Sequence, residues 1–220
     1  MAGWQETKNE EYLRLIRNRI ENVHLVWVEQ FLDLIADYVD GTTNLRINDI
    51  GCQAFQFYKG LRKRGLYSDY FGYDIEQQYL DLGLRHFPEL KSRCGIADIQ
   101  KELPRPCDVT IVSATLEHLF DYRSALNNIV KTTRSLCLIR TFLADETNME
   151  IVYQVGAKKP YHLNEFSRDE IVDIFEKAGF AVEFAVDRYT NGETRDISLE
   201  LEQKDKVMRS QTVILAKYIN

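Results

Sequence analysis

Metal-binding and redox-active cysteine patterns are missing from this sequence. It contains four cysteines and four histidines in 220 residues, and no two cysteines stand at the Cys-x-x-Cys spacing. That spacing is the usual sign of a structural zinc site or a redox-active thiol pair. Three of the cysteines lie in or beside apolar runs, where a thiol packs as a small hydrophobic side chain. We therefore expect no metal site and no redox chemistry.

Long hydrophobic runs and an excess of positive charge are also missing. No apolar run approaches the roughly 18 residues that a membrane-spanning helix needs, and the N-terminal segment has neither the basic start nor the apolar centre of a signal peptide. The net charge of −6 and the pI near 5.4 disfavour a surface that binds nucleic acid by neutralising phosphates. We expect a cytoplasmic protein that acts on a small molecule rather than on a membrane or a nucleic acid.

Short apolar runs alternate with helical stretches along most of the chain. Several runs are apolar on both faces, as buried parallel strands are, and the stretches between them are long enough for crossover helices. This alternation is typical of an α/β fold with a doubly wound sheet. The expected strands are Arg46–Ile50, Tyr70–Asp74, Gly95–Ala97, Val109–Val112, Leu136–Arg140, Phe180–Val186 and Thr212–Lys217.

The N-terminal segment has a different pattern. Apolar residues recur there at steps of three and four from Leu13 to Val39, which predicts a long helical segment that ends near Gly41. We divide the chain accordingly into an N-terminal helical cap of residues 1–43 and an α/β domain of residues 44–220. Packing of the cap on the sheet is the first expectation. A lid and a homodimer surface are alternatives.

One helix and two loops can be placed in the C-terminal half. Ser167 and Glu170 form a capping box at the start of a helix, and Gly179 marks its end. The strand that follows alternates apolar and polar residues, as expected near a sheet edge. Two long stretches, 142–166 and 188–209, are expected to be irregular and to carry variable function.

A carboxylate stands at the end of each of the first two expected strands. The run LRINDIG places Asp49 two residues before Gly51, and Asp74 ends the next strand, 23 residues after Gly51. In nucleotide-binding α/β domains a glycine turn admits the ligand, and an acidic residue about 20 residues on binds the ribose hydroxyls. This pairing favours an adenosyl cofactor.

Five sequence blocks occur in the order and spacing of one enzyme family. They are NDIGC (48–52), FGYDI (71–75), GIADIQKELP (95–104), LEH (116–118) and FSRDEIVDIFEKAGF (166–180). Over about residues 44–217 the chain resembles the class I S-adenosylmethionine-dependent methyltransferases. The resemblance implies a Rossmann-like fold with a seven-stranded mixed sheet, an antiparallel last strand and helices on both faces. It also implies S-adenosylmethionine as the cofactor.

The same resemblance implies roles for individual residues. Asp49 and Gly51 would line the methionine and ribose side of the cofactor, and Asp74, followed by Ile75, would accept bonds from the ribose hydroxyls. The remaining implied contacts are Asp98 and Ile99 at the adenine and Ser113 at the methyl end.

The glycine loop departs from the family pattern. Where the family shows Gly-x-Gly-x-Gly, this chain has Gly51-Cys52-Gln53-Ala54-Phe55, so that Gln53 and Phe55 replace the second and third glycines. A side chain at either position resists the left-handed backbone that glycine adopts without strain. Gln53 is instead a candidate for hydrogen bonding to the amino acid end of the cofactor.

Three residues are candidates for the chemistry. His118 follows the fourth strand, where an imidazole could take a proton from an acceptor hydroxyl or amine. His162 stands in the loop expected to cover the substrate. Glu117 points to the same edge of the sheet. For Glu117 a structural ion pair is an equal alternative, and His118 could also have a packing role.

Three functions are compatible with these observations. The first is a methyltransferase that acts on an oxygen or nitrogen of a small polar metabolite, with a sugar or glycan precursor slightly favoured. The second is a catalytically silent binding or scaffold protein built on the same fold, for which the altered glycine loop is the main argument. The third, an NAD-dependent dehydrogenase, is disfavoured because the Gly-x-Gly-x-x-Gly turn is absent.

Overall fold

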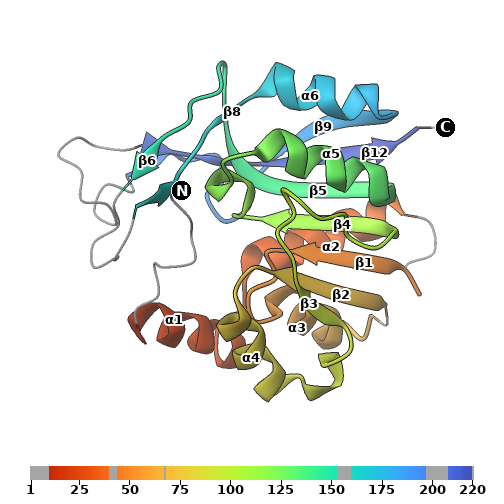
Figure 1. Cartoon of the computed structure of the whole chain (residues 1–220), viewed down its shortest axis with the longest axis vertical. Coiled ribbons are helices and arrows are strands. Elements are labelled where there is room, and N and C mark those ends of the chain that lie inside the picture. Colours follow the sequence, from red (N-terminus) through yellow and green to blue (C-terminus); the bar gives the residue numbers. More distant parts are fainter. Residues whose placement is uncertain (1–9, 40–43, 67, 153–159, 197–207, 220) are drawn as a thin grey trace.

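A mixed sheet forms the centre of the molecule (Figure 1). The computed structural model describes residues 10–39, 44–66, 68–152, 160–196 and 208–219. The strand order is β3-β2-β1-β4-β5-β12-β9, and the short strand β8 pairs with β5 outside this path. β12 runs antiparallel to both of its neighbours, while the pairs from β3 to β5 are parallel. The seven-stranded sheet with an antiparallel last strand is therefore confirmed.

Each expected strand is present, with small changes at the ends. The bounds are β1 Arg46–Ile50, β2 Asp69–Asp74, β3 Cys94–Ile96, β4 Cys107–Ser113, β5 Thr133–Ala144, β9 Phe180–Val186 and β12 Gln211–Tyr218. β9 pairs only with β12 in the sheet, so the edge position predicted from its alternating pattern is also confirmed.

Helices cover both faces of the sheet (Figure 1). Their bounds are α1 Glu10–Glu21, α2 Val26–Tyr38, α3 Gln56–Lys63, α4 Gln77–His86, α5 Tyr122–Thr132 and α6 Arg168–Lys177, with single turns η2 Pro88–Leu90 and η3 Leu116–His118. Neighbouring strand residues point to opposite faces: Leu138 packs in the cluster beneath α2 and α3, and Ile139 packs in the cluster beneath α5 and α6. The sheet is thus buried on both sides, as the apolar runs indicate.

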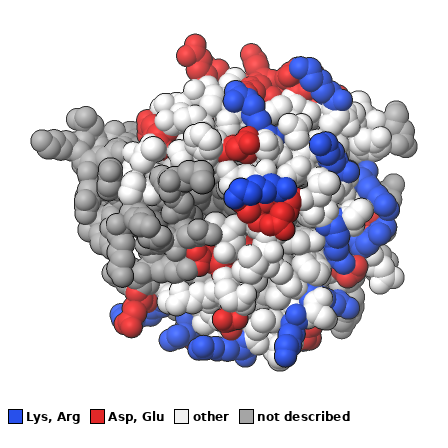
Figure 2. Space-filling view, viewed as in Figure 1, with Lys and Arg blue, Asp and Glu red and all other residues white. Residues whose placement is uncertain are grey.

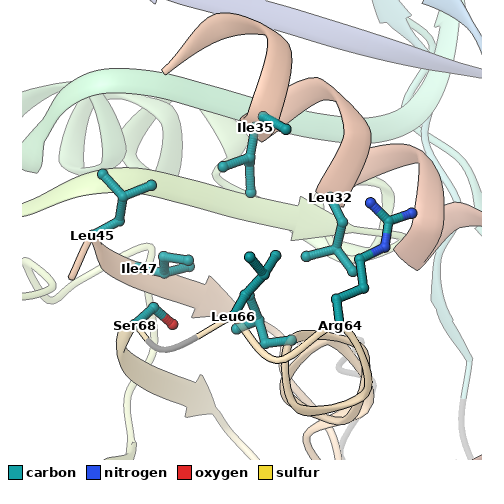
Figure 3. A pocket seen from close by; sticks show the side chains of 9 residues that line it. Leu32, Ile35, Leu45, Ile47, Arg64, Leu66 and Ser68 are labelled. Carbon is teal, nitrogen blue, oxygen red and sulfur yellow. The ribbon is translucent and has the colours of Figure 1, made fainter. Parts of the chain in front are cut away.

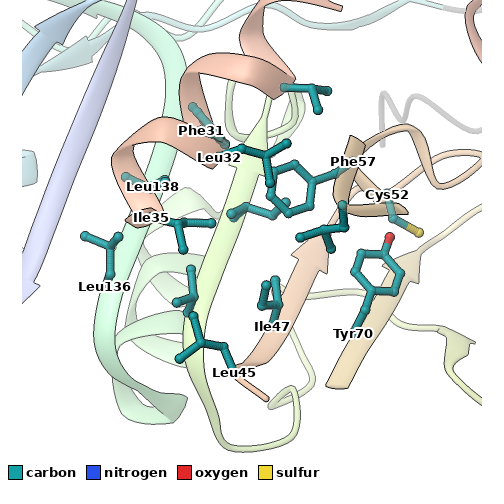
Figure 4. Packing of buried hydrophobic residues seen from close by; sticks show 14 of the residues in the cluster. Phe31, Leu32, Ile35, Leu45, Ile47, Cys52, Phe57, Tyr70, Leu136 and Leu138 are labelled. Atoms are coloured by element: carbon teal, nitrogen blue, oxygen red, sulfur yellow. The ribbon is translucent and has the colours of Figure 1, made fainter. Parts of the chain in front are cut away.

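The N-terminal segment forms two helices rather than the single long one expected. The chain leaves α1 at Asn22, whose backbone N–H bonds the carbonyl of Asn18, and Leu25 has extended backbone angles before α2 begins. The break lets the two helices cover different surfaces. α2 packs on the sheet through Phe31, Leu32 and Ile35 (Figure 4). The separate role of residues 1–43 as a cap stays a prediction.

α1 lies against other parts of the N-terminal half instead of the sheet. Its buried residues Ile16 and Ile20 pack on Ala54, Tyr79 and Leu82, which belong to the turn after β1 and to α4. A helix that precedes the sheet in the sequence therefore lies beside the turn that follows β1.

The stretch 142–166 is less irregular than expected. β5 extends to Ala144, and the hairpin strands β6 (Ile151–Val152) and β7 (Tyr161–His162) and the strand β8 (Phe166–Ser167) follow. In the stretch 188–209, β10 (Arg195–Asp196) pairs with β11 (Met208–Arg209). Residues 153–159 and 197–207 of the two expected loops lie outside the described residues.

The capping box before α6 forms only in part. The Ser167 side chain accepts a hydrogen bond from the backbone N–H of Glu170, as predicted. The Glu170 carboxylate does not return the bond, because it accepts bonds from Tyr122 and Thr147 and pairs with Arg123 instead. Gly179, with φ +85°, ends the helix as expected.

The surface mixes charges of both signs on the face seen in Figure 2, where Lys and Arg side chains stand beside Asp and Glu. In the described part of the chain, no helix is both long enough and apolar enough to cross a lipid bilayer.

Candidate functional site

The candidate residues gather where the parallel strands β1, β2 and β4 end, on the side of the sheet formed by their carboxyl ends. The turn after β1 is fixed there by the carbonyl of Tyr73 on β2, which accepts bonds from the N–H groups of Gly51 at 2.8 Å and Cys52 at 3.0 Å. Gly51 has φ +72°, and a Cβ at this position would lie 2.1 Å from Oγ1 of Thr115 after β4. Only glycine allows the three strand ends to meet this closely.

The two residues that replace loop glycines keep the left-handed backbone. Gln53 has φ +47° and Phe55 has φ +64°, so the turn has the conformation that glycine favours in spite of its side chains. Each such residue stores strain of about 1–2 kcal/mol.

Glycines elsewhere in the chain make room for the Phe55 side chain. Its ring is fully buried, and a Cβ on Gly83 of α4 would lie 2.4 Å from it, while one on Gly72 of β2 would lie 3.1 Å away. The ring also stands edge-on to Tyr70 at 6.4 Å between centroids. Phe55 therefore packs beneath the turn, between β2 and α4, and not over the edge where the strands end.

Asp49 is almost completely buried at the end of β1. Its Oδ2 atom accepts a 2.7 Å hydrogen bond from the Tyr70 hydroxyl. Burial raises the pKa of Asp49 to about 7; the bond from Tyr70 opposes this shift, and the nearby charge of Asp74 adds to it. At neutral pH, this carboxyl group therefore exists in both its protonated and ionised forms.

Asp74 is buried at the end of β2 and joins the two strand ends. Its Oδ2 atom accepts a bond from the backbone N–H of Gln53, and its Oδ1 atom accepts one from the N–H of Glu76, both at 2.9 Å. The two oxygens of this carboxylate therefore hold the turn after β1 and the start of α4 together. Ile75, half-buried, separates Asp74 from Glu76.

Sequence reasoning missed two residues beside Asp74 and Gln53. Glu76 is 4% exposed and precedes α4. Tyr12 on α1 accepts a 3.0 Å bond from the Gln53 side chain, which in turn accepts one from Gln56 at 3.0 Å. A second carboxylate two residues after Asp74 was visible in the sequence, whereas the contact between Gln53 and Tyr12 spans 41 residues and has no local signal.

Asp98 and Ile99 lie beside Asp74, because the N–H of Ala97 bonds the carbonyl of Asp74 at 3.1 Å. The Asp98 carboxylate binds within its own turn, to Gln100 at 3.0 Å and to Lys101 at 2.7 Å. Burial acts to raise the pKa of Asp98, but these bonds outweigh burial and lower it. Ile99 is buried in the cluster beneath α5.

The segment after β4 brings two of the catalytic candidates together. The Nδ1 atom of His118 lies 2.8 Å from the carbonyl oxygen of His162. A carbonyl only accepts hydrogen bonds, so Nδ1 carries a proton, and in the neutral form of the ring the lone pair is on Nε2. Ser113, at the end of β4, accepts a bond through its carbonyl from Thr115. His118 therefore has the tautomer of a base.

His162 is itself 6% exposed, and its Nδ1 atom is buried with no hydrogen-bond partner among the described residues. Burial lowers the pKa of His162; the backbone of Glu150 opposes this effect, and His118 adds to it. The imidazole is therefore neutral at neutral pH.

Glu117 is 1% exposed and faces into the fold. Its carboxylate accepts bonds from Thr141 on β5 at 3.0 Å and from Gln211 on β12 at 3.4 Å. Its carbonyl accepts a bond from the N–H of Asn164, next to the segment that carries His162. Glu117 thus holds η3 against two strands and the covering segment.

Arg140 forms a buried ion pair with Asp187, with Nε and Oδ1 2.8 Å apart. The Asp187 carboxylate also accepts bonds from the backbone and side chain of Thr190. This pair connects β5 to the residue that follows β9.

The arrangement has the chemistry of a nucleoside site next to a base. A glycine turn, two buried carboxylates and a short turn after β3 line the strand ends, and the His118 imidazole, whose Nδ1 faces a carbonyl, lies after β4. The residues fit an adenosyl group, because the Phe55 ring packs beneath the turn and a buried carboxylate, Asp74, stands at the end of β2.

Comparisons with known proteins show the family and the fold. The family model described as "Methyltransferase domain" matches residues 20–184. No curated protein sequence matches the chain.

Three solved structures illustrate the fold. The chain is similar to an S-adenosylmethionine-dependent methyltransferase from Clostridium acetobutylicum (10% identity, 96% of this chain and 99% of that chain, TM-score 0.63). It is also similar to magnesium protoporphyrin IX methyltransferase from Synechocystis with bound SAH (12% identity, 96% of each chain, TM-score 0.60). The third is the [4+2]-cyclase SpnF (13% identity, 86% of this chain and 80% of that chain, TM-score 0.53). At these identities the likeness shows the fold alone.

Proposed function

The chain belongs to the methyltransferase domain family, and on this premise we propose that it transfers a methyl group from S-adenosylmethionine to an oxygen or nitrogen of a small polar metabolite. Sugars and glycan precursors are the first acceptor class to screen. The observation that carries the proposal is the junction of three strand ends at Gly51, where Asp74 fixes the turn through the N–H of Gln53.

The cofactor supplies an activated methyl group on a sulfonium, so the protein needs mainly to align the reactants and exclude water. Asp74 and Ile75 would hold the ribose, and Asp98 and Ile99 would border the adenine. The other proposed contacts are Asp49, Gly51 and Gln53 on the methionine side and Ser113 at the methyl end.

His118 is the proposed general base. Its Nδ1–H donates to the carbonyl of His162, so Nε2 can take the proton that an acceptor hydroxyl or amine loses as it is methylated. Glu117 would act as a positioning residue, because it fixes η3 on β5 and β12. His162 would contribute its carbonyl and its neutral imidazole to the acceptor side.

The first test is calorimetric titration of the whole chain with S-adenosylmethionine, S-adenosylhomocysteine and NAD. We expect the two adenosyl ligands to bind and NAD not to bind. Asp74→Asn removes the charge that strengthens bonds to the ribose, so affinity should fall by about 10- to 150-fold, whereas Asp81→Asn on the exposed face of α4 should change nothing. Binding of NAD alone would contradict the proposal.

A second candidate function rests on the altered loop. Gln53 bonds Tyr12 on α1, and Gln53 and Phe55 stand where the family has glycines, so the fold could serve binding without methyl transfer. A cyclase is also among the structures with this fold. Failure of a folded protein to bind any of the three ligands would favour this second function.

A further inference from the structure

A cavity lies at the starts of the parallel strands β1 and β2, at the opposite ends of these strands from the candidate site. It has a volume of about 270 Å³, and Leu32 and Ile35 of α2 face Leu45, Ile47 and Leu66 across it (Figure 3). Leu45 and Ser68, which also line it, stand immediately before β1 and β2. Gly51 and Asp74 stand at the other ends of β1 and β2. The cavity and the candidate site are therefore separated by the length of these two strands.

This cavity opens to the surface beside Ala36 and Arg64, which are exposed, and its size is unusual for a space among core side chains. Cores are packed as densely as organic crystals, and few voids exceed one water molecule. An apolar void of about 150 Å³ stays dry and takes up benzene, and this cavity is nearly twice that volume. It is therefore large enough for a bicyclic or branched apolar molecule.

One polar atom in the wall has an unused hydrogen-bonding capacity. The Oγ atom of Ser68 is buried and has no hydrogen-bond partner in the described ranges of the chain. Buried polar groups normally have a partner, because an unpaired one loses its hydration without compensation. A ligand that fills the cavity and carries one hydrogen-bonding group would supply that partner.

The charges at the cavity disfavour an anionic ligand. Arg64 lines the cavity, but its Nε atom donates to Glu29 at 2.7 Å and its Nη1 atom donates to Asp33 at 2.7 Å. The carboxylates of Glu29 and Asp33 therefore neutralise the charge of the Arg64 guanidinium. Through these bonds Arg64 also connects the end of α3 to α2. An anion such as a phosphate would have to break these bonds.

We propose that this cavity is a binding site for a neutral, largely apolar small molecule of bicyclic size with one hydrogen-bonding group that pairs with Ser68. The site goes beyond the proposed methyl transfer and does not depend on it. Its occupant would contact the starts of β1 and β2 and the end of α3, which are the elements that carry the turn after β1.

The experiment uses three probes of one shape: 1-naphthol, 1-methylnaphthalene and 1-naphthoate. Each is titrated into the isotopically labelled full chain, and backbone amide shifts locate the site. We expect both neutral probes to shift residues 32–36, 45–47 and 61–68, with 1-naphthol binding roughly 2- to 10-fold more tightly through its hydroxyl. The carboxylate of 1-naphthoate should abolish the response.

Three variants separate a ligand site from a packing defect. Ser68→Ala should remove the preference for 1-naphthol and keep binding of 1-methylnaphthalene, and Ser68→Leu should fill the cavity and abolish binding of both. Ser135→Ala, at a half-buried serine of β5 outside the cavity wall, is the control and should bind like the wild type. The proposal is overturned if neither neutral probe binds the wild type, or if the shifts lie only at residues 49–53, 74–76 and 113–118. It is also overturned if 1-naphthoate binds best.

Discussion

Replacement of Asp49 by asparagine tests the electrostatics at the end of β1. Burial raises the pKa of Asp49 from 3.8 to about 7, so the folded protein retains a proton that the unfolded chain releases. Below pH 3.8 the carboxyl is protonated in both states, and this group does not make stability depend on pH. Above that value the wild type loses stability until the pH passes about 7, a total of about 4 kcal/mol at 1.36 kcal/mol for each pKa unit.

The amide that Asp49→Asn introduces cannot ionise, and its oxygen can still accept the bond from the Tyr70 hydroxyl. The free energy of unfolding of Asp49→Asn minus that of the wild type should therefore rise with pH. Between about pH 4.5 and about pH 8 the rise should be about 3 kcal/mol, because part of the titration lies below this range.

Urea unfolding of both proteins across this pH range measures the difference. Asp37→Asn, at an exposed position of α2, is the control, and its difference from the wild type should stay flat. A flat difference for Asp49→Asn would refute the reasoning that burial controls this carboxyl. A difference that falls with pH would show that the folded protein stabilises the ionised form.

Three further predictions concern other parts of the structure. Phe55→Gly restores the glycine of the family pattern but should cost about 2–4 kcal/mol in urea unfolding, since the loss of a buried ring outweighs the relief of backbone strain. Gly83→Ala should destabilise the wild type more than the Phe55→Gly background, because its methyl group would lie 2.4 Å from the Phe55 ring as well as 3.0 Å from the Ala54 backbone; equal effects in both would contradict the packing described. Asp187→Asn should lower the free energy of unfolding by about 3–5 kcal/mol because it leaves Arg140 buried without its charge partner, and a loss below about 1 kcal/mol would place the pair in solvent. His118→Gln should lower kcat by about 10²- to 10⁴-fold with unchanged calorimetric affinity for S-adenosylmethionine, and an unchanged kcat would remove His118 as the base.

The sheet could be predicted from local patterns because each strand carries its own signal. Apolar runs predicted all seven strands of the path β3-β2-β1-β4-β5-β12-β9, and only the ends of the strands differed from the prediction. β5 extends from Thr133 to Ala144, beyond the expected Leu136–Arg140, because pairing with β4 at Thr133 and with β12 and β8 at the other end continues the strand past its apolar centre. The two N-terminal helices were merged in the prediction because their apolar periodicities are nearly continuous across the break.

The site was predictable where its residues stand at or next to strand ends, as Asp49, Gly51 and Asp74 do. Contacts between distant segments were not predictable. Nothing near Phe55 in the sequence shows that Gly83 would accommodate its ring, and the bond between His118 and His162 joins residues 44 positions apart. The roles of these residues in binding and catalysis stay predictions, which the titration and activity measurements test.

The position of β12 has a consequence for the order in which the molecule assembles. This strand, residues 211–218, lies between β5 and β9 and pairs with seven residues of each. The N-terminal part of the chain leaves the ribosome first, so β5 and β9 are made before β12. Until then the backbone groups of β5 and β9 that pair with β12 have no partner strand. Until residues 211–218 have emerged, both edges are open to pairing with other chains, and the nascent protein is expected to be most prone to aggregation at that stage.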